Sequence, residues 1–178
     1  GILDEDDDIF LGYGYLSNYF PYHARSFYDR EFKNRTLNTV VLENQYLRAE
    51  FLPELGGRLW SLFDKVANRD LLLSNDTMAF GNLAVLNAWF SGGVEWNMGI
   101  IGHSPFTCEP VHTAMLHTAD GTPVLRIYEF ERIRRCTYQI DFWLPDDSKR
   151  LYVGVSIHNP HNTVTPMYWW SNIAVPED

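Results

Sequence analysis

The chain has 178 residues, of which 46% are hydrophobic and 21% are charged, a composition typical of one globular domain with its own core. The formal net charge of −9 argues against nucleic acid or an anionic membrane as a partner, because both would repel the chain. No apolar run reaches the roughly 20 residues of a membrane-spanning helix, so we expect no membrane partner.

The first 38 residues predict an irregular segment. They contain the acidic run Asp4–Asp8, followed by tyrosine and phenylalanine residues that show neither a helical nor a strand period. We expect residues 1–38 to pack on the domain without regular structure. The acidic start is unlike a secretory signal peptide, which favours a cytoplasmic location.

Residues 39–178 predict one domain of antiparallel β-strands. Apolar and polar residues alternate in short runs, and Gly, Pro, Asn or Asp residues mark the turns between them. The expected strands are Thr39–Glu43, Tyr46–Leu52, Arg58–Asp64, residues 71–73, Val111–His117, Pro123–Phe130, Cys136–Leu144, Arg150–Asn159 and Pro166–Val175. No segment shows a helical period, so the pattern predicts an all-β fold, an antiparallel β-sandwich.

The segment Leu83–Cys108 lacks this alternation and is the predicted functional loop. It is rich in glycine, tryptophan and phenylalanine, and glycine permits irregular backbone and close approach of chains. Aromatic rings beside polar groups suit sugars, whose C–H faces stack on indole while their hydroxyls need hydrogen-bond partners. The alternative is a buried aromatic loop that closes one end of the sandwich.

Two titratable residues of this loop are the candidate catalytic residues. Histidine is the side chain best suited to proton transfer near neutral pH, which makes His103 a candidate acid or base. Glu95 lies in an apolar stretch, where a carboxylate needs a partner or a function because an isolated buried charge is costly. The alternatives are a structural histidine and a salt bridge between Glu95 and Arg58.

Further residues are candidates for substrate binding. Arg58 follows a diglycine turn, and its planar guanidinium can hold hydroxyl or carboxylate oxygens. Trp96 and Trp170 are candidate stacking platforms, with core packing as the alternative. Strand alternation places Tyr168, Trp170 and Asn172 on one face of the last strand, opposite a more apolar face.

The sequence indicates no metal site and no cofactor. His112 and His117 are five residues apart, and such positions on a strand point to opposite faces. The sequence also contains no phosphate-binding glycine loop and no nucleophile elbow. We expect Cys108 and Cys136 to be free, buried thiols.

Three stretches resemble the galactose-mutarotase-like group, which includes aldose 1-epimerases and hexose-6-phosphate epimerases. They are VVLENQYLRAEFLPELGGRLWSLFDKVANRDLL (Val40–Leu72), FSGGVEWNMGIIGHSPF (Phe90–Phe106) and NPHNTVTPMYWWSNIAV (Asn159–Val175). From Val40 to Glu177 the chain more closely resembles a bacterial domain of unknown function that is often fused in front of tetratricopeptide repeats. The resemblance implies a mutarotase-like supersandwich, in which His103 matches the histidine of the epimerase loop.

The chain departs from the epimerase pattern at two points. The acid histidine of the epimerases falls near Trp170–Asn172, where this chain has no histidine. The epimerase base is a carboxylate late in a longer domain. We therefore expect an N-terminal part of a supersandwich, with a homodimer or a C-terminal tetratricopeptide-type region as its partner.

The sequence predicts a carbohydrate-binding or carbohydrate-processing domain, accessory to a larger sugar-active or repeat-containing protein. A full-length form would be a glycoside hydrolase or sugar epimerase, whereas this chain alone is expected to be inactive. The alternative is a non-catalytic scaffold that packs on tetratricopeptide-type helical repeats. An open concavity shared by His103, Glu95 and Arg58 would favour the carbohydrate site, and a closed aromatic core would favour the scaffold.

Overall fold

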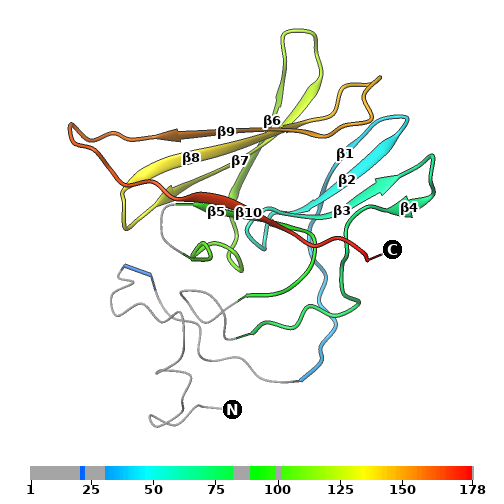
Figure 1. Cartoon of the computed structure of the whole chain (residues 1–178), viewed down its shortest axis with the longest axis horizontal. Coiled ribbons are helices and arrows are strands. Elements are labelled where there is room, and N and C mark those ends of the chain that lie inside the picture. The colour runs from blue at the N-terminus through cyan, green and yellow to red at the C-terminus, as the bar shows by residue number, and fades with distance from the viewer. Residues whose placement is uncertain (1–20, 23–30, 82–88, 99–101, 178) are drawn as a thin grey trace.

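A computed structural model of the chain describes residues 21–22, 31–81, 89–98 and 102–177, which form two packed antiparallel sheets (Figure 1). The six-stranded sheet has the order β1-β2-β3-β5-β10, with β4 paired to β3, and the four-stranded sheet has the order β6-β7-β8-β9. The strands are β1 (Val40–Glu43), β2 (Leu47–Leu52), β3 (Arg58–Asp64), β4 (Arg69–Asp70), β5 (Val94–Met98), β6 (His112–His117), β7 (Pro123–Glu131), β8 (Cys136–Trp143), β9 (Tyr152–His158) and β10 (Trp169–Ile173). The described residues contain no helix, which confirms the predicted all-β sandwich.

The expected short strand at residues 71–73 is wrong, because the pairing with β3 occurs at Arg69–Asp70 instead. The carboxylate of Asp70 is the reason. Its Oδ1 atom accepts hydrogen bonds from the backbone N–H groups of Leu62 (3.1 Å) and Leu72 (2.9 Å). The N–H of Leu71 still donates to the carbonyl of Leu62 at 2.9 Å, but the carboxylate takes the reciprocal bond from Leu62 and ends the ladder there.

The predicted irregular loop also contains a strand, β5, which joins β3 to β10. Its sequence, VEWNM, alternates apolar and polar residues, but the strand has only five residues and lies among the glycines on which the loop prediction depended. The preceding glycines, Gly92 and Gly93, have φ angles of +110° and +65°. A Cβ atom on Gly93 would lie 2.3 Å from the carbonyl oxygen of Leu59, so only glycine lets the chain approach β3 here.

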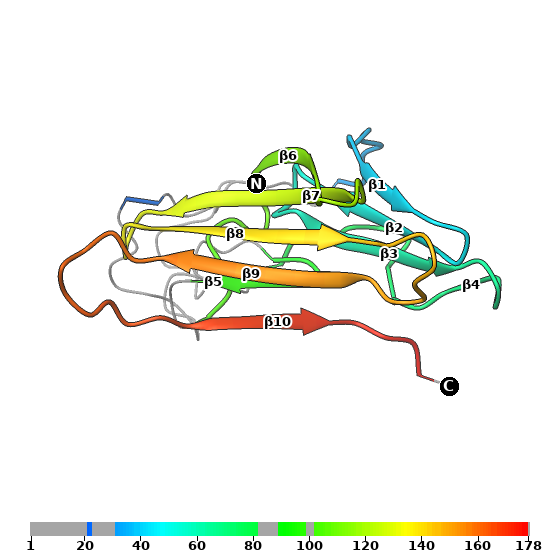
Figure 2. The same ribbon diagram turned by 90° about the horizontal axis from the view of Figure 1, so that it is seen from above.

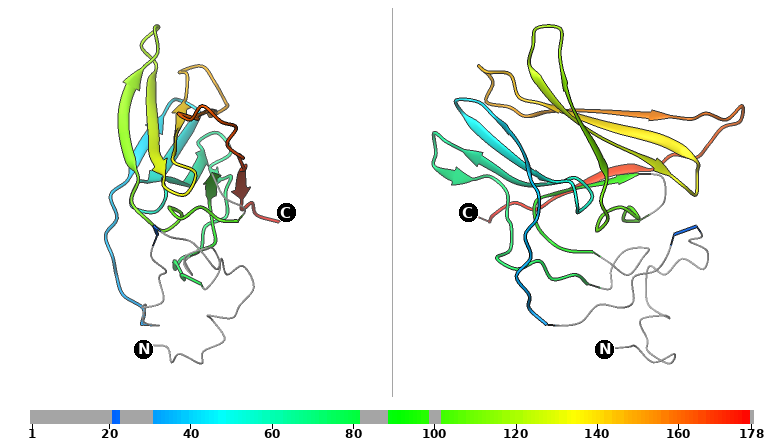
Figure 3. Two further views of the ribbon diagram at one scale, coloured as in Figure 1. Left: turned by 90° about the vertical axis from the view of Figure 1, so that its left-hand side faces the viewer. Right: turned by 180° about the vertical axis from the view of Figure 1, so that it is seen from behind.

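Apolar residues fill both sides of the six-stranded sheet. The main core lies between the two sheets, which Figure 3 shows end-on as two layers. A smaller cluster covers the other side of β2 and β3 and contains Leu52, Leu55, Phe90 and Cys108. Residues of β3 and β5 that face this second cluster are therefore shielded from water. Both cysteines are free and buried, as expected.

The core is open along one side of the sandwich, where β9 and β10 end the two sheets (Figure 2). Val153 and Val155 are each 41% exposed, although they pair with the buried core residues Phe142 and Ile140 of β8. Ile173 of β10 is 56% exposed. These inward-facing apolar side chains lack a cover in this structure.

Tyr22 connects the N-terminal segment to the core. Its ring packs edge-on against Phe106 at 5.7 Å, and its hydroxyl donates to Oε1 of Glu131 at 3.1 Å. The same hydroxyl accepts a hydrogen bond from the backbone N–H of Arg132 at 2.8 Å. Residues 1–20 and 23–30, on which most of the expectation for an irregular segment falls, lie outside the described residues.

Candidate functional site

Glu95 of β5 is the centre of a group of polar and aromatic side chains, here called the Glu95 cluster. The cluster comprises Arg58, Trp89, Glu95, His103, Thr107 and Trp170. These residues come from β3, from the two ends of the predicted functional loop, from β5 and from β10. The fold thus brings together four predicted site residues, Arg58, Glu95, His103 and Trp170.

Glu95 is 2% exposed, and both of its carboxylate oxygens are hydrogen-bonded. Nδ1 of His103 lies 2.9 Å from Oε1 and 3.0 Å from Oε2. Thr107 donates its hydroxyl to Oε1 at 2.6 Å, and the indole N–H of Trp89 donates to Oε2 at 3.0 Å. A buried carboxylate is stable when such donors replace its water shell.

Arg58 is the buried cation beside this carboxylate. Its guanidinium lies 3.9 Å from Oε1 of Glu95, so the salt bridge considered from the sequence is present. Nη1 donates to the carbonyl oxygens of Phe90 and Gly92, both at 2.9 Å, and Nη2 donates to the Thr107 hydroxyl at 3.0 Å. The guanidinium also stacks over the Phe90 ring at 3.7 Å. With these contacts, Arg58 holds the loop before β5 in place.

His103 lies at the surface of the cluster, with a side chain 23% exposed. Because Glu95 accepts at Nδ1, we assign the ring proton to Nδ1, which leaves Nε2 without a hydrogen-bond partner in the described part of the chain. The ring contacts two indoles, with ring centres 5.5 Å from Trp89 and 5.0 Å from Trp170. The imidazole of His103 is thus fixed in orientation through Nδ1, and Nε2 is the nitrogen that can react.

The segment that carries His103 is fixed to β5 and to the turn before β3. The backbone N–H of Ser104 donates to Oδ1 of Asn97 at 2.5 Å, and the N–H of Gly56 donates to the carbonyl of Glu109 at 2.8 Å. Trp170 donates its indole N–H to the carbonyl of Gly102 at 3.3 Å. Strand and turn contacts therefore position the imidazole more firmly than a free loop would.

The charges of the cluster respond to their surroundings. Burial raises the pKa of Glu95, but the hydrogen bonds from His103, Thr107 and Trp89 outweigh it and hold that pKa below its ordinary value. Burial lowers the pKa of Arg58, and the neighbouring carboxylate of Glu95 opposes this effect. Glu95 is thus an anion at neutral pH.

The structure does not bring the other predicted site residues into the cluster. Trp96 points from β5 toward the core, where its ring packs 5.2 Å from Phe142 and its indole N–H donates to the carbonyl of Gly57. This is the core packing considered as its alternative. Asn172 pairs with Glu95 across β5 and β10 and is exposed. Tyr168 is 46% exposed just before β10.

Trp89 and Thr107 complete the cluster, although the sequence reasoning assigned no role to either. Both hydrogen-bond to Glu95. Both lie within Leu83–Cys108, the predicted functional loop. Their place within that loop was the available signal.

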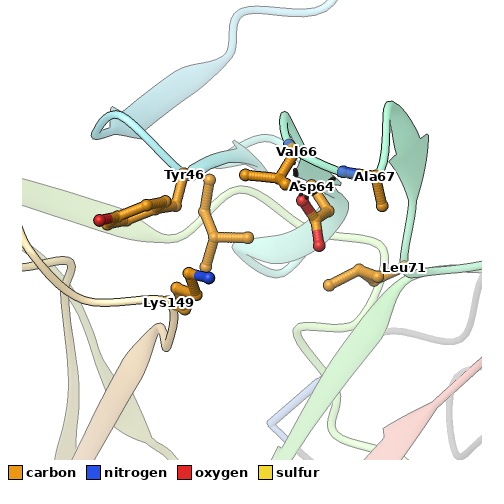
Figure 4. A pocket seen from close by; sticks show the side chains of 7 residues that line it. Tyr46, Asp64, Val66, Ala67, Leu71 and Lys149 are labelled. Atoms are coloured by element: carbon orange, nitrogen blue, oxygen red, sulfur yellow. Dashed lines mark hydrogen bonds between the residues drawn. The ribbon is translucent and has the colours of Figure 1, made fainter.

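A hollow of about 190 Å³ lies elsewhere, near the turn between β3 and β4 (Figure 4). Asp64 accepts hydrogen bonds from the backbone N–H groups of Val66 at 2.8 Å and Ala67 at 2.9 Å. Lys149 lies on the far wall, 5.2 Å from the Tyr46 ring centre. The Asp64 carboxylate therefore stabilises the turn, and we assign this hollow no part in the functional site. The described residues contain no group of His, Cys, Asp and Glu that could hold a metal ion.

Fold and cluster define the class: a β-sandwich domain in which a buried carboxylate holds a partly exposed histidine beside two indoles. A family model described as a domain of unknown function (DUF5107) matches residues 15–178, and the chain belongs to that family. The match agrees with the expected bacterial domain of unknown function.

A solved structure is similar to most of the chain. It is a TPR-domain containing protein from Parabacteroides distasonis ATCC 8503, with a TM-score of 0.82 and 26% sequence identity over 92% of this chain. The chain spans 28% of the length of that protein. The chain is thus similar to part of one protein that contains a TPR domain.

Proposed function

We propose that the domain recognises a carbohydrate at the exposed side of the Glu95 cluster. The observation that supports this proposal is the position of His103, which Glu95 holds through Nδ1 and which contacts the rings of both Trp89 and Trp170. Indole faces suit the C–H faces of sugars, while the free Nε2 atom can exchange a hydrogen bond with a sugar hydroxyl.

The same arrangement suits proton transfer. A base or acid needs one accessible nitrogen in a defined orientation, and Glu95 supplies the orientation through the other nitrogen. Arg58 and Glu95 are themselves too deeply buried to touch a substrate, at 2% exposure each. In this proposal they are positioning residues, and His103 is the group that meets the sugar.

The test is a titration of the chain with a panel of mono- and oligosaccharides, monitored by tryptophan fluorescence. Binding should quench or shift the emission, and Trp170→Ala should weaken it by about 1–3 kcal/mol, the scale of an aromatic contact at a binding hot spot. Phe32→Ala removes an exposed ring outside the Glu95 cluster and should leave binding unchanged. A panel without any response would contradict the proposal.

A second candidate function is a scaffold for helical repeats. The observation that favours it is the uncovered apolar edge of the sandwich, with Val153, Val155 and Ile173 exposed, together with the TPR-domain containing protein that the fold matches. Large exposed apolar patches mark interaction surfaces. In a longer protein that includes the helical repeats, Val155→Lys should then disrupt the contact between the β-domain and the repeats and leave sugar binding intact.

A further inference from the structure

The outward face of the four-stranded sheet contains a hollow of about 540 Å³. This volume lies within the range of about 300–1,000 Å³ that ligand sites occupy. The lining residues come from every strand of the sheet, and strand alternation turns most of their side chains away from the core, while Glu129 and Tyr138 belong to the inward-facing rows. The hollow is separate from the Glu95 cluster, which belongs to the other sheet.

Aromatic rings form one end of the hollow. Tyr128 and Phe130 of β7 are 42% and 44% exposed. The ring of His112 on β6 stacks on Tyr128, with centres 5.4 Å apart and planes 23° apart. Exposed rings on a sheet present broad apolar faces at little cost in conformational freedom, as binding surfaces require.

A strip of polar side chains follows next to the rings. Gln139 of β8 pairs with Tyr128 on one side and with Ser156 of β9 on the other. In the neighbouring row, Arg126 forms a two-pronged ion pair with Asp141, with N–O distances of 2.7 Å each. These groups offer hydrogen-bond donors and acceptors along the floor of the hollow.

A second aromatic pair lies further along the same face. Trp143 of β8 and Tyr152 of β9 stack with centres 5.5 Å apart and planes 13° apart. A Cβ atom on Gly154 would lie 3.3 Å from the Trp143 ring, which shows that the ring covers this glycine. Trp143 is four positions along β8 from Gln139, the residue that pairs with Tyr128, so the two aromatic groups are about 13 Å apart along the strands.

Charge decides the class of ligand. Arg126 and Asp141 neutralise each other, and Oε1 of Glu129 lies 3.6 Å from Nε2 of His112. A nucleotide or another polyanion would find no unpaired lysine or arginine among the lining residues, because Arg126 is paired with Asp141. An apolar protein segment would bury the polar strip of Arg126, Gln139 and Ser156 without matching its hydrogen bonds.

We propose that this face, here called the outer-sheet platform, binds a neutral oligosaccharide laid across β6–β9. Sugar rings stack at Tyr128 and Phe130 and at Trp143, and hydroxyls between them bond to the polar strip. A single sugar ring is too short to reach both aromatic groups. The platform therefore favours chains of several sugar units over monosaccharides.

The experiment titrates the chain with cellohexaose, maltohexaose and xylohexaose, with glucose as the short probe, using calorimetry and two-dimensional amide NMR. At least one hexasaccharide should shift amides of β7, β8 and β9, and glucose should bind far more weakly. Tyr128→Ala and Trp143→Ala should each weaken the hexasaccharide about tenfold or more, whereas Tyr128→Phe should retain binding. Thermal unfolding of each variant checks that the sheet is intact.

Trp170→Ala separates this platform from the Glu95 cluster. If the hexasaccharide binds to the outer-sheet platform, the amide shifts on β7–β9 should persist in that variant. If Trp170→Ala abolishes all hexasaccharide binding and Tyr128→Ala does not, the Glu95 cluster is the sugar site and the platform proposal is wrong. If no hexasaccharide shifts the amides of β7–β9 of the folded protein, the proposal is also wrong. The outer-sheet platform would then be a candidate surface for a protein partner.

Discussion

Nδ1 of His103 lies 2.9 Å from Oε1 of Glu95, and the carboxylate side chain is 2% exposed while the imidazole is 23% exposed. One buried anion thus orients a partly exposed imidazole. The same anion faces Arg58 and accepts hydrogen bonds from Trp89 and Thr107. Glu95 therefore links the segments before and after β5, which makes it the residue on which both stability and the site depend.

Glu95→Gln should destabilise the domain. The amide keeps the shape of the side chain but leaves the Arg58 cation without its partner, and loss of one member of a buried pair costs about 3–5 kcal/mol. Urea unfolding should show this loss, with the slope of the transition unchanged. Glu54→Gln is the control, because Glu54 pairs with Arg35 at the surface, and this change should have little effect. Equal stability of the two variants would contradict the structure.

Glu95 should also give the domain a specific loss of stability in acid. Its pKa is lowered in the folded state, so its contribution is present above the unfolded value of about 4.3 and is lost as the pH falls through the folded pKa. Unfolding free energies measured from pH 7 down to pH 3 should therefore converge for the wild type and Glu95→Gln. A constant difference across this range would show that the carboxylate is not held as an anion.

Gly93→Ala should be far more damaging than Gly121→Ala. Both glycines have positive φ angles, +65° and +88°, so alanine strains the backbone at either by about 1–2 kcal/mol. A Cβ atom on Gly93 would lie 2.3 Å from the Leu59 carbonyl oxygen, whereas one on Gly121 would meet nothing within 4 Å. The crowding should add roughly 1–3 kcal/mol or more for Gly93→Ala, visible in thermal unfolding. Similar melting temperatures would mean that β5 can move away from β3.

His103 should matter for turnover only where a complementary group is present. A histidine acid needs a second group on the other side of the sugar, and Glu95 is fully engaged with its own partners. We expect this chain alone to show no anomer exchange by NMR and no release of reducing sugar. In an active longer form, His103→Ala should reduce turnover by about 10²–10⁴-fold. Turnover by the chain alone would show that its site is complete.

The open side of the sandwich predicts self-association or a covering partner. Unpaired edge strands with exposed apolar residues tend to pair with another chain. Val155→Lys and Ile173→Lys place a charge on the uncovered inward face of β9 and β10 and should shift the isolated chain toward monomer in light scattering. Val66→Lys, a 69% exposed position outside β9 and β10, is the control. A wild-type chain that stays monomeric at high concentration would rule out the homodimer.

Much of the fold follows from local alternation. Strand β8 shows this directly: Cys136, Tyr138, Ile140 and Phe142 are buried and alternate with more exposed neighbours. Such a strand has one face on the core and one toward water, and a period of two in the sequence records this. Strand Arg58–Asp64 was predicted with its exact bounds for the same reason. The free, buried cysteines were predicted from their number, because two cysteines are too few for a disulfide framework.

The tertiary structure alone decided where β5 lies and which side chains meet there. The sequence of β5, VEWNM, alternates like that of an ordinary surface strand, but both of its faces are covered, because its burial depends on segments distant in the chain. The sequence determined that Arg58, Glu95, His103 and Trp170 were chemically suited to a site. Sheet pairing decided that these four converge while Trp96, one residue from Glu95, points into the core, because adjacent residues of a strand face opposite sides.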